Sequence, residues 1–258
     1  MQQQRNYVIS VAGFDPSAGA GILADIKTFE QLGVYGLGVC SAITVQTEDQ
    51  FQSVRWISYE EIISQLQLLL EKYEVDVMKI GIIENFEVLI KILLFLKENF
   101  PFVKIIWDPV LKASAGFEFH AAIHYSGFLE CCKNVFLITP NTEEVCALLQ
   151  QTDAFVAAEK LQSFTHVFLK SYKNPDGRVQ DILFEENENY NYDTMLLNGF
   201  EKHGSGCVLA AAITSFLASG NDLRSSCELA KSYTFEFLKS APGLLGAHHS
   251  IKQFANHA

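Results

Sequence analysis

The sequence predicts an α/β fold in which a mostly parallel central sheet is covered by helices on both faces, as a three-layer α/β/α sandwich. Two observations lead to this prediction. Strand-like and helix-like segments alternate along the chain, and the strand-like segments are apolar at nearly every position, as strands buried on both faces are. Hydrophobic residues make up 49% of the 258 positions, enough to fill a sizeable core. No repeat, linker or low-complexity tract divides the chain, so residues 1–258 are expected to form one domain.

The first half of the chain begins with a strand over residues 7–13, where apolar residues lead into the polar turn 14–17. A helix follows, in which apolar residues recur every three or four positions from Ile22 to Leu32, and Gly33 ends it. Apolar runs likewise predict strands over residues 36–46, 75–80 and 104–107. Apolar residues at a spacing of three or four positions predict helices over residues 60–73 and 86–99.

The second half continues this alternation with shorter strands. Pro140-Asn141 closes a strand over residues 136–139 and opens a helix that runs to Leu149. The turn Asn-Pro-Asp-Gly at 174–177 separates two short strands. The remaining predicted elements are strands 166–170 and 181–184, a helix that contains Cys207 and ends near Gly220, and a last helix from the Asp222 cap to Lys239.

Charge and hydropathy argue against several classes of protein. The net charge of −11 argues against nucleic acid or an anionic membrane as a partner. The most apolar segment, residues 86–96, contains Glu87 and Lys91 and therefore fits a buried helix better than a membrane span. The polar N-terminus lacks the apolar run of a signal peptide. The six cysteines show no disulfide framework, so we expect reduced thiols and a cytoplasmic location.

A glycine motif, His203-Gly204-Ser205-Gly206-Cys207, stands directly before an apolar, alanine-rich helical segment. The first amides of a helix have no intrahelical acceptor, and the helix dipole adds partial positive charge there. The motif therefore predicts an anion site, most naturally for phosphate. Cys207 falls in the first turn, where the dipole is expected to lower the pKa of a thiol. The alternative is a tight loop before a packed helix with a buried cysteine.

Polar residues stand at the ends of the predicted strands. In a parallel sheet the carboxyl ends of the strands meet at one edge, and ligands bind beyond that edge. Any single polar residue at such a place is commonly structural, whereas several that converge indicate a site. The residues expected to converge are Asp15, Gln46, Asp108, Asn141 and Lys170.

The glycine motif and four other blocks together resemble the hydroxymethylpyrimidine/phosphomethylpyrimidine kinases of thiamine synthesis. The blocks occur in the order of that family and cover nearly the whole chain. They are residues 12–29 (from Ala-Gly-Phe-Asp-Pro-Ser to Thr-Phe), Lys79-Ile80-Gly81, Asp108-Pro109-Val110, Thr139-Pro140-Asn141 with Glu144, and residues 203–207. The resemblance implies a ribokinase-like fold, ATP and Mg²⁺ as co-substrate and metal, a small pyrimidine as substrate, and a homodimer.

The resemblance also implies roles for individual positions. Cys207 matches the catalytic position, and Gln46 matches the residue that binds the pyrimidine. Gly204, Ser205 and Gly206 match the anion hole around the transferred phosphoryl group. The other matched positions are Gly13, Ala20 and Val110 in the pyrimidine pocket, Lys170, Asn141 and Asp108 beside the phosphates, and Glu144 at the metal.

Two of these roles have a clear chemical basis. A glutamine amide presents one donor and one acceptor side by side, and Gln46 would thus match the amine and the adjacent ring nitrogen of a 4-aminopyrimidine. Pyridoxal has no such pair. The substrate alcohol must lose a proton during transfer, and Cys207 is the candidate acceptor. His203, in contrast, is expected to shape the loop.

Three departures from the family pattern bear on these expectations. Ser171-Tyr172 replaces the usual Gly-Gly after Lys170, so a larger side chain is expected to narrow the approach of the nucleotide. Ile82 replaces a common Met, and Glu201-Lys202 replaces Asn-Thr. Two alternatives therefore stand beside the leading hypothesis: a pyridoxal or pyridoxine kinase on the same scaffold, and a catalytically silent pyrimidine-binding protein.

Overall fold

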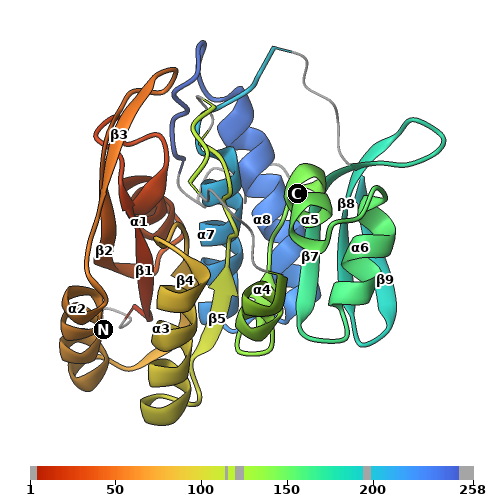
Figure 1. Cartoon of the computed structure of the whole chain (residues 1–258). Helices are drawn as coiled ribbons and strands as arrows, with labels where there is room; N and C mark the ends of the chain where they lie inside the picture. The colour runs from red at the N-terminus through yellow and green to blue at the C-terminus, as the bar shows by residue number, and fades with distance from the viewer. Residues whose placement is uncertain (1–4, 114–115, 120–124, 194–198, 250–258) are drawn as a thin grey trace.

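The central sheet of the computed structural model is described, with its helices, for residues 5–113, 116–119, 125–193 and 199–249 (Figure 1). Within these residues nine strands form one sheet in the order β3-β2-β1-β4-β5-β6-β7-β8-β9. The neighbours from β2 to β7 pair in parallel, and the pairings of β3, β8 and β9 are antiparallel. The strands are β1 (Tyr7–Phe14), β2 (Tyr35–Gln46), β3 (Phe51–Trp56), β4 (Val75–Ile80), β5 (Lys104–Trp107), β6 (Leu137–Ile138), β7 (His166–Lys173), β8 (Val179–Glu185) and β9 (Glu188–Asp193). The predicted mostly parallel sheet is confirmed.

Helices cover both faces of this sheet. In Figure 1, α7 and α8 lie behind the sheet, whereas α3, α4 and α5 lie in front of it. The helices of the front layer are α2 (Tyr59–Lys72), α3 (Phe86–Asn99), α4 (Tyr125–Cys132), α5 (Thr142–Leu149) and α6 (Ala154–Leu161). The helices of the back layer are α1 (Gly21–Gln31), α7 (Ser205–Ala218) and α8 (Leu223–Lys239). Each layer packs its own apolar cluster against the sheet, which confirms the three-layer α/β/α arrangement.

Helix α7 is the buried helix of the back layer. It packs against α1, α8 and the central strands, so nearly every position from Val208 to Ser215 is buried. The small side chains of residues 210–212 allow this close approach. The Thr214 and Ser215 hydroxyls donate to the carbonyls of residues 210 and 211, so their burial leaves no unpaired polar group. Because α7 is held on all sides, its N-terminus has a fixed position at the carboxyl edge of the sheet.

Several elements of the structure were not predicted. Strand β3 pairs antiparallel with β2 at the edge of the sheet. Its residues are largely exposed, so the sequence lacks the continuous apolar run by which buried strands are predicted. Strand β9 is equally polar, with the sequence Glu-Asn-Tyr-Asn-Tyr-Asp. The short helices α4 and α6 are also additional. That residues 1–258 form one domain stays a prediction.

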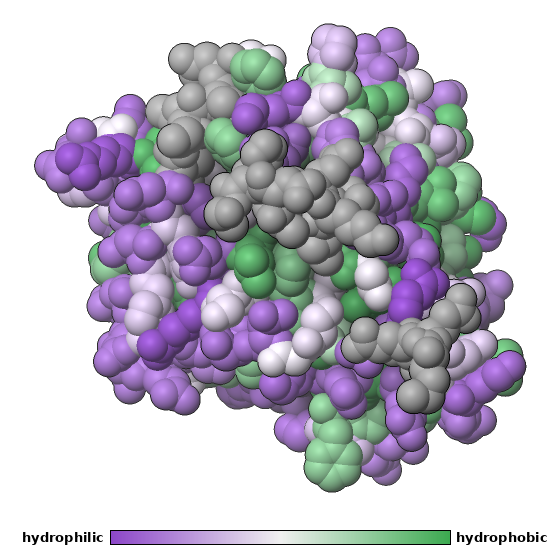
Figure 2. Space-filling model, turned by 180° about the vertical axis from the view of Figure 1, so that it is seen from behind, coloured by the Kyte–Doolittle hydropathy of each residue, from purple (hydrophilic) through white to green (hydrophobic). Residues whose placement is uncertain are grey.

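The outer surface of the back layer is mostly hydrophilic, with apolar side chains in small groups (Figure 2). This agrees with the amphipathic pattern of α8, whose buried residues, such as Tyr233 and Phe237, face α7 and the C-terminal segment. None of the described helices is both long enough and apolar enough to cross a membrane.

Candidate active site

A pocket of about 190 Å³ lies at the carboxyl edge of the parallel strands. Its walls come from the ends of β1, β2 and β7, from the segments that follow β4, β5 and β6, and from the N-terminus of α7. The structure brings all twelve predicted site residues together in this lining: Gly13, Ala20, Gln46, Asp108, Val110, Asn141, Glu144, Lys170, Gly204, Ser205, Gly206 and Cys207.

The N-terminus of α7 forms one wall of the pocket. Gly204 caps the helix with φ of 73°, a left-handed conformation that favours glycine, and an added Cβ would lie 2.7 Å from Ala20 Cα. The amides of Gly206 and Cys207 donate no hydrogen bond to any other described residue. They therefore point two unpaired donors at the space where an anion would bind.

The Cys207 thiol differs from the sequence-based expectation. Its side chain is partly exposed to the pocket, but burial by the surrounding protein raises the pKa of the thiol to about 11. The positive charge of Lys79 and a hydrogen bond from the Gly21 amide act in the opposite direction and are outweighed. The expected lowering of the pKa by the helix N-terminus was therefore wrong, because desolvation of the thiolate is the larger effect.

Lys170 and Asp108 form a buried ion pair at the centre of the pocket, with 2.9 Å between Nζ and Oδ1. Burial alone would lower the pKa of Lys170, but Asp108 and Glu144 raise it above its ordinary value. Burial would raise the pKa of Asp108, but Lys170 and Lys79 lower it, so both groups are charged. Thr139 Oγ1 also donates to Oδ1 of Asp108.

The second oxygen of Asp108, Oδ2, is buried and has no hydrogen-bond partner among the described residues. A buried carboxylate oxygen without a donor is a natural ligand for a divalent cation or its water. Glu144 lies on the other side of Lys170, with 4.0 Å between Nζ and Oε2. Among the described residues, no group of three or more His, Cys, Asp or Glu side chains is arranged to hold a metal ion. Mg²⁺ does not require such a group, because it is usually held by one or two carboxylates together with waters and phosphates.

Glu144 also stabilises the start of α5. The Asn141 side chain accepts a hydrogen bond from the Glu144 amide, and the Glu144 carboxylate accepts one from the Asn141 amide, each at 2.8 Å. Burial raises the pKa of Glu144, although Lys170 opposes the shift. Glu144 thus has a structural role in addition to any contact with a metal.

Asp15 and His203 connect the turn after β1 to the glycine loop before α7. His203 Nε2 lies 2.8 Å from Asp15 Oδ2, and Asp15 also accepts from the amides of Ser17 and Ala20, each at 2.9 Å. Both side chains are nearly inaccessible to solvent. This network fixes the loop geometry, in agreement with the shaping role expected for His203.

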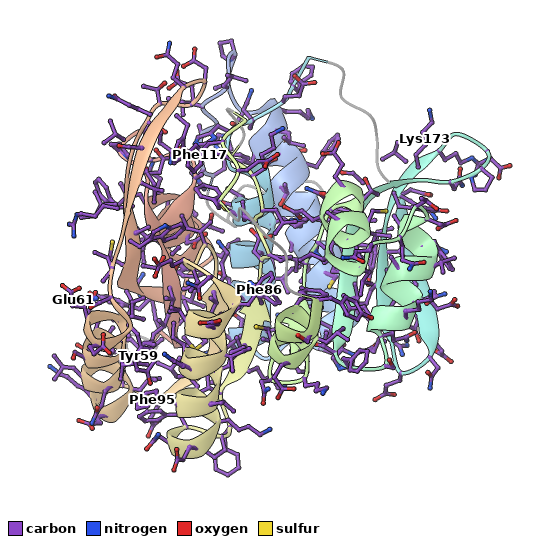
Figure 3. All side chains as sticks on the ribbon, viewed as in Figure 1. Tyr59, Glu61, Phe86, Phe95, Phe117 and Lys173 are labelled. Atoms are coloured by element: carbon purple, nitrogen blue, oxygen red, sulfur yellow. The ribbon has the colours of Figure 1, made fainter. Side chains whose placement is uncertain are left out.

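Aromatic side chains lie at the end of the pocket that contains Gln46. The segment after Val110 turns back, so Phe117 stacks on Phe51 of β3 with ring centroids 4.3 Å apart, and Figure 3 shows Phe117 beside that edge of the sheet. Phe119 lines the pocket and meets Phe51 edge-on. Sequence reasoning missed Phe119 because β3, its partner strand, was not predicted. It also missed Thr44 as a lining residue, although Thr44 lies two residues before Gln46.

A larger groove of about 790 Å³ adjoins the pocket between the end of β7, strands β8 and β9, and helix α8. The two share Asn141, Lys170, Ser205 and Gly206 in their linings. The groove and the pocket therefore meet at the N-terminus of α7.

Of the two residues expected to narrow the approach of the nucleotide, Ser171 lines this groove and the larger Tyr172 does not. Ser171 has φ of 55°, a left-handed conformation that explains why glycine suits the position. Its amide donates to Asp181 Oδ1 at 2.7 Å, which holds the backbone in that shape. The Tyr172 ring packs against Phe155 of α6, with centroids 5.9 Å apart, and is absent from the lining of both cavities.

Comparison with known proteins identifies the family. Residues 15–252 match the family model of phosphomethylpyrimidine kinase. The hydroxymethylpyrimidine/phosphomethylpyrimidine kinase of Aquifex aeolicus is 31% identical over 258 residues, covering 95% of this chain and 99% of that protein. The phosphomethylpyrimidine kinase of Clostridium difficile 630 superposes with a TM-score of 0.76 at 28% identity, covering 90% of this chain and 99% of that one.

The fold is shared more widely than the family. The pyridoxal kinase of Bacillus subtilis, solved as an ADP complex, superposes with a TM-score of 0.83 at 24% identity over 97% of this chain and 100% of that one. At this identity the likeness shows the architecture alone. The family model and the Aquifex relative carry the assignment further: the chain belongs to the phosphomethylpyrimidine kinase family and has the ribokinase-like fold.

Proposed function

We propose that this protein uses ATP to phosphorylate the alcohol of 4-amino-5-hydroxymethyl-2-methylpyrimidine and then phosphorylates the resulting monophosphate. One observation carries the proposal. Gln46, at the substrate end, and the amides of Gly206 and Cys207, at the phosphoryl end, line the same 190 Å³ pocket. A substrate whose ring is held by Gln46 would thus present its alcohol to the anion site.

The residues at the Gln46 end of the pocket support a small, flat pyrimidine as the substrate. Gln46 supplies a donor and an acceptor, and Ile82, Val110 and Phe119 supply apolar surface. An added Cβ at Gly13 would lie 2.5 Å from Ile82 Cδ1, so the Ile82 side chain fits here because residue 13 has no side chain. The pairing of the Gln46 amide with the aminopyrimidine edge favours this substrate over pyridoxal.

The adjoining groove is the proposed site for ATP. Because its lining shares Lys170 and Gly206 with the pocket, a nucleotide in the groove would place its terminal phosphate at the N-terminus of α7. Asp108 and Glu144 would hold the Mg²⁺ ion, which neutralises phosphate charge when it is bound. Lys170 and the α7 amides would then stabilise the charge on the transferred group.

Cys207 is the proposed acceptor of the proton from the substrate alcohol. With the pKa of the thiol at about 11, only a small fraction is thiolate at neutral pH. The thiolate takes the proton while the alcohol oxygen forms its bond to phosphorus and the bond to ADP breaks. The rate is therefore expected to rise with pH toward the pKa of the thiol.

A coupled assay of ADP release, with the pyrimidine alcohol and pyridoxal as parallel substrates, tests the proposal. We expect kcat/KM to be higher for the pyrimidine. Turnover of pyridoxal alone would favour a pyridoxal kinase, and turnover of neither substrate would favour a silent binding protein. A cytoplasmic homodimer is also part of the proposal, and light scattering of the purified protein tests the dimer.

A further inference from the structure

A buried cluster of charged and polar side chains lies beneath the reacting end of the pocket. Lys79 of β4 and Asp25 of α1 form an ion pair, with 2.6 Å between Nζ and Oδ1, and neither side chain is exposed to solvent. Ser10 of β1, the register neighbour of Lys79, donates from Oγ to Asp25 Oδ2 at 2.6 Å. Both carboxylate oxygens therefore have a donor.

Stability does not explain this cluster. A lysine is almost never fully buried without a partner, and a buried ion pair is often no more stabilising than apolar side chains of the same volume. Most side chains packed around α1 and α7 are apolar, and the buried hydroxyls of Thr28, Thr214 and Ser215 donate to carbonyls of their own helix, so no other ion pair of the described residues is buried with them. The pair therefore calls for another role.

The cluster lies beside Cys207. Lys79, Cys207 and Asp108 line the same pocket, and α1, which carries Asp25, packs against α7. The charged groups that act on the thiol are Lys79 on β4, Asp25 on α1, Asp108 after β5 and Lys170 on β7. Two cations and two carboxylates from four segments thus act electrostatically on one thiol.

We propose that Lys79 is a positioning residue that keeps a fixed positive charge against Cys207 and the incoming phosphoryl group, and that Asp25 and Ser10 hold the lysine in place. The effect on catalysis rests on the proposed function, because it acts through Cys207. The effect on the thiol itself does not depend on any substrate.

The charge of Lys79 persists despite its burial. Burial would lower the pKa of the ammonium group, but the negative charge of Asp25 raises it above its ordinary value, so the group is charged at all physiological pH values. Lys79 is in turn the largest influence that lowers the pKa of Cys207 against burial. The negative charge of Asp25 acts directly on the same thiol and raises its pKa.

The reactivity of the Cys207 thiol gives a test that a purely structural role of Lys79 would not affect. The rate of iodoacetamide labelling of Cys207 at pH 9 is measured by mass spectrometry of the tryptic peptide 203–224, which contains no other cysteine. Below the pKa of the thiol this rate is proportional to its thiolate fraction. We expect Lys79→Met to label about tenfold more slowly, which corresponds to a rise of about one pKa unit. Asp25→Asn leaves the buried lysine without the carboxylate that holds it in place and keeps it charged, so this variant is also expected to label more slowly.

Three controls complete the experiment. Lys79→Arg keeps the charge and is expected to restore most of the labelling rate. Cys146, a partly exposed thiol on α5, is labelled in the same samples and is expected to be unchanged. Because Lys79→Met leaves Asp25 buried without a partner, the double variant Lys79→Met/Asp25→Leu provides a better-packed chain that still lacks the cation. It is expected to label more slowly than the unmodified protein.

Kinetics then connect the thiol to the reaction. In Lys79→Met, kcat for the pyrimidine is expected to fall by roughly tenfold or more, with a smaller change in KM for ATP, and its rise with pH is expected to shift to higher pH. Equal labelling rates in folded Lys79→Met and in the unmodified protein would overturn the proposal. Slower labelling of Lys79→Met in a protein that phosphorylates neither substrate would support the Lys79 assignment and refute the proposed function.

Discussion

Cys207 experiences two opposing effects, burial and nearby positive charge, and burial is the larger one. Its thiol is thus mostly protonated at neutral pH and would act as the proposed base only in its thiolate fraction. The amides of the glycine loop belong to the backbone, so in the proposed function they would bind a phosphoryl group whether or not the thiol is present. Binding and proton transfer are therefore separable at this residue.

Removal of the thiol is expected to lower kcat and leave nucleotide affinity nearly unchanged. For Cys207→Ala we predict that kcat falls by roughly 10²- to 10⁴-fold, the range for a lost general base. Cys207→Asp is expected to recover part of the rate, because a carboxylate accepts the same proton. Steady-state kinetics from pH 6 to 10 check this, and the rise of kcat with pH is expected to disappear in Cys207→Ala. A near-normal kcat in that variant would reduce Cys207 to a packing residue.

Gln46 determines the substrate in the proposed function. Gln46→Leu would leave two polar groups of the pyrimidine unpaired in the pocket, at about 1–3 kcal/mol each. We therefore expect kcat/KM for the pyrimidine alcohol to fall by roughly 10- to 1000-fold or more. Gln52→Leu, an exposed glutamine on neighbouring β3 that does not line the pocket, is the matched control. Equal turnover by the two variants would contradict the role of Gln46.

At the scale of elements, the N-terminus of α7 depends on the close approach of two loops. Gly204 has φ of 73° and lies against the backbone of Gly19 and Ala20. Gly220, just after α7, has φ of 90° but no atom near the position of an added Cβ. The two glycines thus share the backbone conformation and differ in the steric contact.

Substitution of each glycine by alanine separates the two effects. Gly220→Ala is expected to destabilise the fold by about 1 kcal/mol, the strain of a left-handed alanine, and to keep full activity. Gly204→Ala adds a collision with backbone atoms, so we expect a lower melting temperature and loss of most phosphoryl transfer. Thermal unfolding measures the melting temperature of each variant, and the coupled assay of ADP release measures its phosphoryl transfer. If Gly204→Ala behaved like Gly220→Ala, the fixed geometry of the loop would not matter for catalysis.

The elements also show which parts of the structure the sequence predicts. Parallel strands and the long amphipathic helices were predicted, because a continuous apolar run or a 3.6-residue period marks them. Strands β3 and β9 were not, because they are exposed edge strands whose residues carry no such pattern. The glycine motif and the strand ends predicted part of the candidate site, and the family resemblance added Gly13, Ala20, Val110 and Glu144. Phe119 was not predicted, because its place depends on a contact with β3 that no local sequence pattern indicates.

The buried charges could not be placed from the sequence either. Lys79 and Asp25 stand 54 positions apart, and only the packing of α1 on the sheet brings them together. The pKa of Cys207 depends on the same packing, because desolvation is a property of the whole surrounding fold. Composition and helix position alone suggested the opposite direction of shift.

At the scale of the whole molecule, the groove between the β7–β9 region and α8 is expected to bind ATP. Calorimetry with Mg²⁺ and a non-hydrolysable ATP analogue is predicted to show binding at or below millimolar concentration. Tyr172→Phe is the control and is expected to leave the affinity unchanged, because the ring packs on Phe155 outside the groove. No detectable binding at millimolar nucleotide would favour the silent-protein alternative.

The central claim is that one pocket performs two successive phosphorylations of a pyrimidine alcohol. ³¹P NMR of the purified protein with Mg²⁺, ATP and 4-amino-5-hydroxymethyl-2-methylpyrimidine follows both steps in one sample. The predicted result is a phosphate monoester signal that appears first and is replaced by the two signals of a diphosphate ester, with one ADP formed for each phosphate transferred. Phosphorylation of pyridoxal but not of the pyrimidine, or no organic phosphate ester from either, would contradict the claim.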